Sequence, residues 1–237
     1  MGVPIKIEVE NIFGDYEHLF NRSARIFVGY SGGLDSTVLL HLACKYVKAG
    51  RVTALHVNHG LSSDADVWEQ HAERQSDELS ANFEAHRVSC QARINTEALA
   101  RDARYGVFEK TLAEDDILLL AHHADDQAET VMYSLLRGSG STGMSGIPVT
   151  RDLGLGRLLR PLLGRTKAQI KSYATRHRLK WIEDESNLDT SFDRNYLRHR
   201  ILPLIAKRWA GHQNRIAITA SQSKNDKSLA KSIFLND

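Results

Sequence analysis

Six consecutive residues, Ser31-Gly32-Gly33-Leu34-Asp35-Ser36, bring two hydroxyl groups, a glycine pair and one carboxylate into one short stretch. A glycine pair lets the backbone turn sharply and approach a ligand closely, because no Cβ stands in the way. At the start of a helix, the first N–H groups and the helix dipole favour an anion. The hydroxyls add donors, and the Asp35 carboxylate could hold a hydrated Mg²⁺ beside phosphate groups. These residues therefore predict a phosphate-binding loop.

The alternative for this stretch is an ordinary turn between a strand and a helix, with a serine as the helix cap. No Gly-x-x-x-x-Gly-Lys-Ser/Thr string occurs in the chain, so the loop is not of the Walker A type. Apolar residues precede the loop at 25–30 and follow it at 37–43. The position after a strand and at the start of a helix favours phosphate binding over an ordinary turn.

A second polar stretch, His122-His123-Ala124-Asp125-Asp126-Gln127-Ala128-Glu129-Thr130, follows another apolar run. Asp125 is the predicted N-cap of a helix that begins here. Asp126 and Glu129 then stand three residues apart on one helical face and can converge on one cation. The alternative, acidic residues placed at a helix start because of its dipole, explains Asp125 but not the flanking histidines.

Four histidines, at positions 56, 59, 122 and 123, raise the question of zinc. The chain lacks the histidine and carboxylate spacing that is typical of zinc enzymes, so we do not expect a zinc site. The string from Gly138 to Gly143 matches Gly-x-Gly-x-x-Gly, but it follows a predicted helix rather than a strand. It is therefore not interpreted as a dinucleotide fingerprint, and a flexible loop is expected there.

Two pairs of arginines have helical spacing. Arg101 and Arg104 lie three residues apart and could face phosphate groups, with pairing to Glu97 as the alternative. Arg194 and Arg198 lie four residues apart and share one face of a helix predicted to begin near residue 193.

The elements that must position these residues alternate along the chain. Strands are predicted at 25–30, 51–57, 83–88 and 116–121, and helical patterns lie between them. This alternation predicts an α/β fold, with a parallel sheet and helices on both faces. Ligands bind at the carboxyl ends of such strands, so residues 31–36, 56–60 and 122–126 are expected at one rim of the sheet.

Charge is distributed unevenly along the 237 residues. Residues 1–156 hold 14 Lys/Arg against 22 Asp/Glu, whereas residues 157–215 hold 14 Lys/Arg against 5 Asp/Glu. We therefore expect a core domain over 1–156, a basic and mostly helical extension over 157–215, and a tail or linker helix over 216–237. The basic excess favours a polyanionic partner such as nucleic acid, with solvated helix faces as the alternative.

The remaining composition predicts a cytoplasmic protein without a membrane partner. No apolar run is long enough to span a bilayer, and the N-terminus lacks the apolar region of a signal peptide. Cys44 and Cys90 are the two cysteines of the sequence and form no Cys-x-x-Cys pair. Neither a disulfide framework nor a cysteine-based metal site is therefore indicated.

Taken in order, several segments resemble the catalytic N-terminal domain of the tRNA(Ile)-lysidine synthetase family, which belongs to the PP-loop ATP-pyrophosphatase superfamily. The segments are residues 31–36, 56–61, 97–105, 122–129 with 137–140, 160–163, and 181–187 with 194–195. The resemblance implies the Rossmann-like ATP-pyrophosphatase fold. Longer members of that family continue into C-terminal domains that hold the tRNA acceptor end. Many relatives also carry Arg where this chain has Ser62.

The resemblance implies an ATP-dependent ligase that joins free L-lysine to C2 of the wobble cytidine in an isoleucine tRNA with a CAU anticodon. The products are lysidine, AMP and pyrophosphate, formed through an adenylated cytidine. It implies Mg²⁺ at Asp35 by way of the ATP phosphates, and it leaves a homodimer open. The implied site residues are Ser31, Gly32, Gly33, Leu34, Asp35, Ser36, His56 and Arg104 for ATP, Asp35, His122, Asp126 and Glu129 for catalysis, and Arg194 and Arg198 for tRNA.

Two other classes of function share some of these features. A tRNA 2-thiolation enzyme would have the same loop but needs cysteines that are typically paired, and this chain has no such pair. A non-catalytic module that binds RNA or nucleotide would not need Asp35, Asp126 and Glu129 together. The ligase is the function that accounts for all three carboxylates.

Overall fold

The computed structural model of the chain describes residues 9–47, 50–60, 64–88, 96–183 and 189–234. The chain divides into two compact units. The first, here called the sheet unit, comprises residues 1–121, 150–162 and 168–183. The second, here called the helical unit, comprises residues 122–149, 163–167 and 184–237. Ser62, Cys90 and residues 184–187, which carry sequence predictions, lie outside the described residues.

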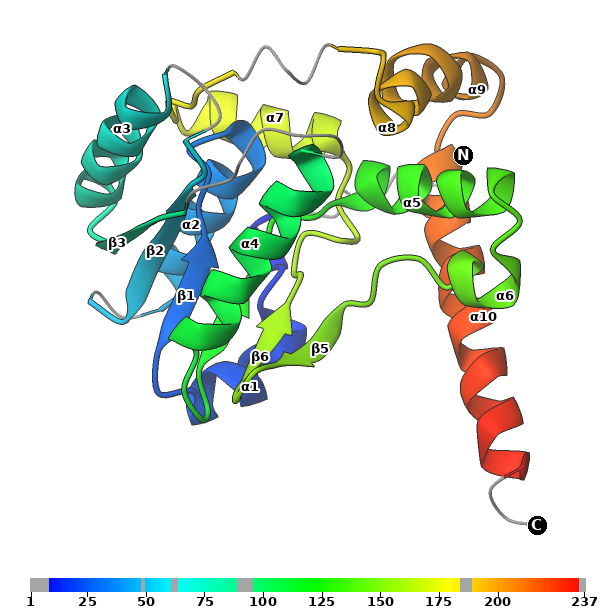
Figure 1. The fold of residues 1–237 in the computed structure, drawn as a ribbon, viewed down its shortest axis with the longest axis horizontal. Helices are drawn as coiled ribbons and strands as arrows, with labels where there is room; N and C mark the ends of the chain where they lie inside the picture. The colour runs from blue at the N-terminus through cyan, green and yellow to red at the C-terminus, as the bar shows by residue number, and fades with distance from the viewer. Residues whose placement is uncertain (1–8, 48–49, 61–63, 89–95, 184–188, 235–237) are drawn as a thin grey trace, which may run out of the picture. The chain divides into compact units, whose positions relative to one another are not determined.

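The sheet unit is organised around a sheet that has six strands in the described residues, in the order β3-β2-β1-β4-β6-β5 (Figure 1). The first five strands in this order, which run from β3 to β6, pair in parallel with their neighbours. The last strand, β5, pairs antiparallel with β6. The predicted α/β fold with a parallel sheet is therefore confirmed. The strands are β1 (Ile26–Gly29), β2 (Val52–Asn58), β3 (Asn82–Arg87), β4 (Ile117–Leu119), β5 (Thr150–Leu153) and β6 (Gly156–Leu159).

The hairpin of β5 and β6 was not predicted. Each strand is only four residues long, and the first three residues of β5 are exposed, so neither shows the longer apolar run that marked β1, β2 and β4. Gly154, with φ +57°, makes the turn between them. The domain boundary expected after residue 156 falls at the first residue of β6, and that division stays a prediction.

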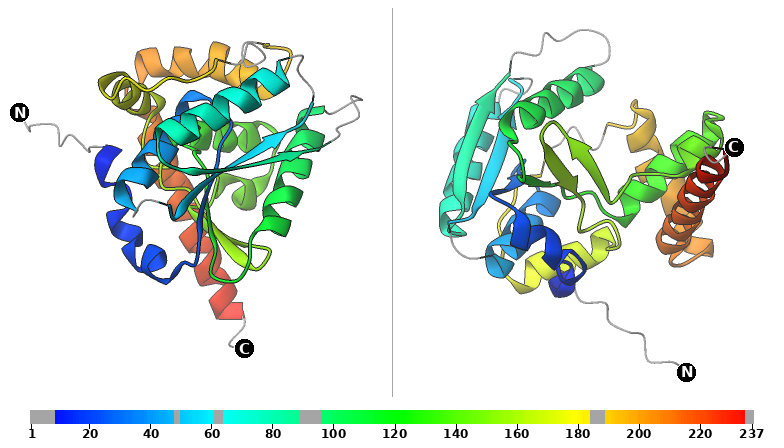
Figure 2. Two further views of the ribbon diagram at one scale, coloured as in Figure 1. Left: turned by 90° about the vertical axis from the view of Figure 1, so that its left-hand side faces the viewer. Right: turned by 90° about the horizontal axis from the view of Figure 1, so that it is seen from below.

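Helices cover both faces of this sheet. In Figure 2 (right), α4 lies on one face, and α2 and α7 lie on the other. This follows from right-handed crossovers, because the chain moves outward from β1 to β3 and then returns to β4 through α4. The helical elements here are η1 (Val9–Asn11), η2 (Gly14–Tyr16), α1 (Glu17–Arg22), α2 (Leu34–Tyr46), α3 (Ala65–Glu78), α4 (Thr96–Thr111) and α7 (Lys167–Arg176).

The core beneath α4 fixes the position of that helix on the sheet. Phe108 and Leu112 project from α4 and its end onto apolar side chains of the strands, including Phe27 and Leu118. Each of these four side chains is almost fully buried, so each contributes roughly 1.5–3 kcal/mol to folding. Phe108 and Leu112 therefore anchor the last turn of α4 on the sheet.

The helical unit contains α5, α6, α8, α9 and α10 in its described residues. A five-residue π-helical turn, Leu197–Ile201, joins α8 to α9. The helix α10 packs along α5 and α6. The bounds are α5 (Ala124–Leu136), α6 (Gly140–Met144), α8 (Asp193–Tyr196), α9 (Leu202–Arg208) and α10 (His212–Phe234).

The prediction of a flexible loop at residues 138–143 is wrong, because the short helix α6 begins at Gly140. The reason is close packing. A Cβ on Gly143 would lie 2.9 Å from the Cβ of Ser134, so the small residue allows α6 to pack on the end of α5.

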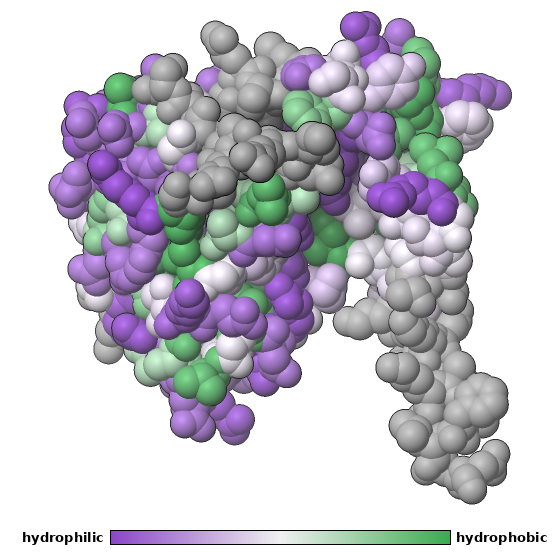
Figure 3. Space-filling model, in the orientation of Figure 1, coloured by the Kyte–Doolittle hydropathy of each residue, from purple (hydrophilic) through white to green (hydrophobic). Residues whose placement is uncertain are grey.

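The surface is mixed in character. Hydrophilic side chains (purple in Figure 3) predominate on the face of the sheet unit turned to the viewer, with apolar side chains scattered between them. Among the described residues, no helix combines the length and the hydropathy that a membrane crossing requires.

Candidate active site

The predicted phosphate-binding loop connects β1 to α2 in the sheet unit. Gly32 has φ +79°, a left-handed conformation that favours glycine, and Gly33 is the extended N-cap of α2. Gly33 has no side chain with which to cap the first-turn N–H groups of α2. Those groups are donors that a helix leaves without an intrahelical partner, and they suit an anion.

The two serines of the loop hold its ends together. Ser31 Oγ and Ser36 Oγ lie 3.1 Å apart, and Ser36 Oγ–H donates to the Gly33 carbonyl at 3.0 Å. The Gly33 N–H in turn donates to Ser31 Oγ at 3.3 Å. The loop is therefore preorganised by its own hydroxyl groups, which keeps the entropic cost of binding low.

A distant segment also fixes the loop. Ile182 N–H donates to the Gly32 carbonyl at 2.9 Å, and Gly33 and Ile182 form an isolated parallel bridge. Residues 181–183 thus act as a short extra strand beside the loop. Residues 181–183, which belong to one of the segments that carry the family resemblance, therefore lie beside the loop.

Asp35 lies in the first turn of α2, and its Oδ1 is buried. Within the described residues, no group of three or more His, Cys, Asp or Glu side chains has a geometry suited to a metal ion. The donor set therefore fits Mg²⁺ only in the way that nucleotide enzymes use it, with one carboxylate and the substrate phosphates as ligands.

His56 stands behind the loop. It is 6% exposed, and its Nδ1–H donates to the carbonyl of Tyr30, the residue before Ser31, at 2.9 Å. Burial lowers the pKa of His56, so the ring is neutral at physiological pH. Burial and the neighbouring Arg104 guanidinium likewise lower the pKa of His59. Predicted ATP-site residues His56 and Arg104 therefore belong to the same unit as the loop, with His56 supporting the backbone at its start.

In the helical unit, the N-cap of α5 is His123, so the prediction of Asp125 as N-cap is wrong. His123 N–H donates to Asp126 Oδ2 at 2.9 Å, and Asp126 N–H donates to His123 Nδ1 at 3.4 Å. Each residue thus satisfies a backbone donor of the other, as in a capping box. Asp125 instead accepts from Lys167 N–H at 2.8 Å and from the side chain of Gln213 at 3.2 Å.

Asp126 and Glu129 share a face of α5, as expected, and Arg198 meets both of them. Its Nε and Nη2 donate to the two carboxylate oxygens of Glu129 at 2.6 and 2.7 Å, and Nη2 donates to Asp126 at 3.4 Å. The Glu129 side chain is only 2% exposed. Burial raises the pKa of Glu129, and the Arg198 guanidinium acts against that rise.

Arg194 also contacts α5, donating from Nη2 to Thr130 Oγ1 at 3.0 Å. Both arginines predicted to contact tRNA therefore make contacts with the acidic helix. His122, which is half-buried, begins the helical unit two residues before α5. The sequence gives no signal for the pairing of Glu129 with Arg198, because 69 residues separate them.

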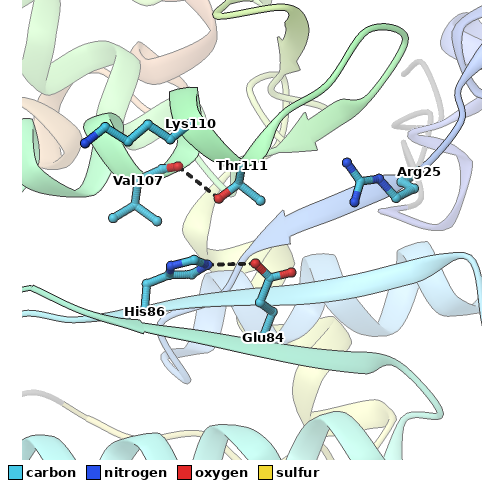
Figure 4. A pocket seen from close by; sticks show the side chains of 6 residues that line it. All are labelled: Arg25, Glu84, His86, Val107, Lys110 and Thr111. Atoms are coloured by element: carbon cyan, nitrogen blue, oxygen red, sulfur yellow. Dashed lines mark hydrogen bonds and ion pairs between the residues drawn. The ribbon is translucent and has the colours of Figure 1, made fainter.

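An open depression of about 360 Å³ lies elsewhere on the sheet unit (Figure 4). Glu84 and His86 of β3 form its floor and are joined by a 2.7 Å contact, and Arg25 lies at one end. None of the residues that line this depression belongs to the loop of residues 31–36, and Arg25 precedes β1 whereas the loop follows it. We therefore do not place the nucleotide there.

A family model described as the PP-loop domain matches residues 2–205. The chain belongs to the PP-loop domain family. Membership implies that the PP-loop protein uses ATP, and it accounts for the glycine pair, the serines and Asp35 in one loop.

Similar proteins include the tRNA(Ile)-lysidine synthase of Pseudomonas fluorescens (strain Pf0-1), which is 46% identical over 205 residues, 85% of this chain and 46% of the relative. The synthase of Escherichia coli O157:H7 is 41% identical over 219 residues, 91% of this chain and 51% of the relative. The PP-loop chain thus spans about half the length of these curated relatives.

A solved structure with the same fold is the U34-tRNA thiolase NcsA from Methanococcus maripaludis, described with its [4Fe-4S] cluster. The TM-score is 0.69 at 16% identity, covering 85% of this chain and 72% of the thiolase chain. At this identity the likeness concerns the fold alone.

Proposed function

We propose that this chain is the catalytic part of a tRNA(Ile)-lysidine synthase, which joins free L-lysine to C2 of the wobble cytidine in a CAU isoleucine tRNA. The observation that carries the proposal is the 46% identity to the Pseudomonas fluorescens synthase over 85% of this chain. The site residues supply what the chemistry needs, in two steps.

In the first step, the C2 oxygen of cytidine attacks the α-phosphorus of ATP. A new P–O bond forms, the α–β anhydride bond breaks, and pyrophosphate leaves. Ser31, Gly32, Gly33, Leu34 and Ser36 hold the phosphates, supported by His56 and Arg104. Asp35 would hold Mg²⁺, and the bound metal ion would neutralise charge on the leaving pyrophosphate.

In the second step, the ε-amine of lysine attacks C2. The C2–O bond breaks, AMP leaves with the bonding electrons, and the amine loses a proton. Asp126 and Glu129 with Arg198 amount to two carboxylates and one guanidinium, a net charge of −1 that suits one ammonium group. His122 completes the group of residues proposed to seat lysine.

The basic residues of 157–215, including Arg194 and Arg198, are proposed to face the tRNA. A polyanionic partner is the usual reason for a sustained excess of Lys and Arg. Because its proposed substrate is a tRNA, the protein is proposed to be cytoplasmic. We also propose that it can form a homodimer.

The test is mass spectrometry of an unmodified CAU isoleucine tRNA transcript after incubation with the chain, ATP and isotope-labelled lysine. The proposal expects labelled lysidine at the wobble position, one AMP per lysidine, and no product without ATP. A methionine elongator tRNA transcript is the matched control. Absence of lysidine, with ATP bound and the RNA intact, would reject the proposal.

Sulfur transfer is the outcome that would replace this proposal, since a tRNA thiolase shares the fold. The cysteine content of the chain argues against sulfur transfer. The sequence has two cysteines, fewer than the ligands that a cubane iron–sulfur cluster normally takes. Burial raises the pKa of Cys44 to about 11, which keeps that thiol protonated.

A further inference from the structure

Three arginines of the sheet unit converge on one tyrosine. The guanidinium carbons of Arg101 and Arg151 lie 5.0 and 5.1 Å from the ring centre of Tyr105. Arg160 Nη2 donates to the Tyr105 hydroxyl at 3.3 Å. The three residues come from α4, β5 and the end of β6, so the fold and not the local sequence brings them together.

The cluster is fixed in place. Tyr105 packs edge-on against Phe108 of the α4 core, with ring centres 5.9 Å apart. Arg160 is 3% exposed, so the desolvation cost of that guanidinium is met during folding and not on binding. Arg101 and Arg151 are exposed and accessible from solvent.

The electrostatics are those of a site for an anion. Burial alone would raise the pKa of the Tyr105 hydroxyl, but the guanidinium groups of Arg101, Arg160 and Arg151 outweigh it and lower that pKa. Burial lowers the pKa of Arg160, its contact with Tyr105 acts against that shift, and the charges of Arg151 and Arg101 lower the pKa further. Such mutual repulsion costs folding free energy, and a bound phosphate group would relieve it, since guanidinium groups match phosphate oxygens in geometry.

The position of the cluster separates it from the PP-loop. Arg160 directly follows β6, Arg151 pairs with Leu158 near the end of β6, and Arg101 is in the first turns of α4. All three thus lie at the carboxyl end of the sheet, where ligands bind in this class of fold. The strand β4 lies between β1 and β6, so two strand spacings, roughly 10 Å, separate the ends of the strands that lead to the two features.

We propose that Arg101, Arg151 and Arg160, arranged around Tyr105, bind a backbone phosphate of the RNA substrate. The inference rests on the proposed function. A nucleic acid is favoured over ATP because the PP-loop already provides a cradle for the ATP phosphates, and because two of the three arginines are open to a long polymer.

The experiment compares wild type with Arg101→Ala/Arg151→Ala, in which both changed residues are exposed and the fold is expected to remain intact. Binding of the CAU isoleucine tRNA transcript is measured over a series of KCl concentrations, and ATP affinity is measured by calorimetry. The double variant should reduce the slope of log Kd against log salt by roughly one for each lost phosphate contact, with ATP affinity unchanged. Arg74→Ala, an exposed arginine of α3, is the matched control and should keep the wild-type slope.

A wild-type slope in the double variant would overturn the inference, as would an equal change in Arg74→Ala or no RNA binding by wild type. Loss of ATP affinity with an unchanged RNA slope would assign the cluster to ATP. Tyr105→Phe keeps the ring and should keep the slope. Lysidine formation by wild type at saturating RNA reports on the proposed function separately, so the two can fail independently.

Discussion

Arg198 holds Glu129 by two hydrogen bonds, Nε to Oε1 at 2.6 Å and Nη2 to Oε2 at 2.7 Å. The family resemblance implies different tasks for these residues, catalysis for Glu129 and tRNA binding for Arg198. The ion pair couples the two roles, because the Glu129 carboxylate proposed to attract the lysine ammonium already accepts hydrogen bonds from the Arg198 guanidinium. The first two predictions follow from this pair.

Replacing Glu129 with Gln removes one charge at nearly constant shape. We expect adenylation of tRNA to survive while lysine use weakens, at a cost of roughly 1–3 kcal/mol for one charged hydrogen bond. The assay follows the adenylated intermediate and lysidine in one time course at several lysine concentrations. Glu109→Gln, on the exposed side of α4, is the control. Unchanged lysine dependence would move the lysine pocket elsewhere.

Replacing Arg198 with Ala leaves Glu129 buried without its partner. Removing one partner of a buried pair is costly, and because Arg198 is 28% exposed we expect a loss of roughly 1–3 kcal/mol of stability in urea unfolding. The same guanidinium is proposed to face the tRNA, so lysine use should fall and the salt dependence of tRNA binding should flatten. A wild-type salt slope together with impaired lysine use would limit the role of Arg198 to holding Glu129.

Replacing Asp35 with Ala should abolish formation of adenylated tRNA and leave the fold intact. Its carboxylate lies at the start of α2 beside the glycine pair, where it can act on the phosphates and their metal ion. Pyrophosphate release measures the loss, and circular dichroism checks the fold. Asp77→Ala, an exposed carboxylate of α3, should behave as wild type. Pyrophosphate release at the wild-type rate from the Asp35 variant would refute the role in adenylation.

The two glycines of the loop should respond differently to alanine. Gly32 has φ +79°, so Gly32→Ala should cost roughly 1–2 kcal/mol and weaken ATP binding. A Cβ there would make only ordinary contacts, 3.7 Å to Ile182 and 3.8 Å to His71, so the cost comes from the backbone. Gly33 is extended, and Gly33→Ala should unfold closer to wild type. Equal loss in both variants, measured by urea unfolding, would contradict this account.

His41 predicts a pH dependence of stability. Its Nδ1 lies 3.0 Å from the Tyr173 hydroxyl, and burial, His177 and Lys45 lower its pKa to about 4. The unfolded chain takes up this proton near pH 6.5 and the folded chain only near pH 4. Stability that is present above pH 6.5 should therefore fall as the pH decreases toward 4, by up to about 1.4 kcal/mol per pH unit.

The measurement is urea unfolding over that pH range for wild type and His41→Gln. The variant should show a shallower loss of stability toward acid. His18→Gln, at an exposed position in α1, should keep the wild-type profile. Parallel profiles for wild type and His41→Gln would remove His41 as the cause.

Much of the sheet could be predicted because β1, β2 and β4 are largely apolar and alternate with helices, and buried parallel strands have that pattern. The edge strand β3 is more polar and more exposed. The phosphate loop could be predicted because its chemistry is local. The contact of Arg198 with Glu129 and the Tyr105 cluster could not, since both depend on how distant segments pack. His123 was missed as a cap because Asp is the more common N-cap residue and lay two positions further on.

The hydrogen bond from Ile182 N–H to the Gly32 carbonyl joins an early loop to a late segment. During synthesis, β1, the loop and α2 leave the ribosome long before residue 182 is made. The nucleotide loop therefore lacks its last backbone partner until most of the chain has emerged. A nascent chain is thus expected to reach its full affinity for ATP only after residue 182 has been translated. Incomplete chains would therefore bind less nucleotide.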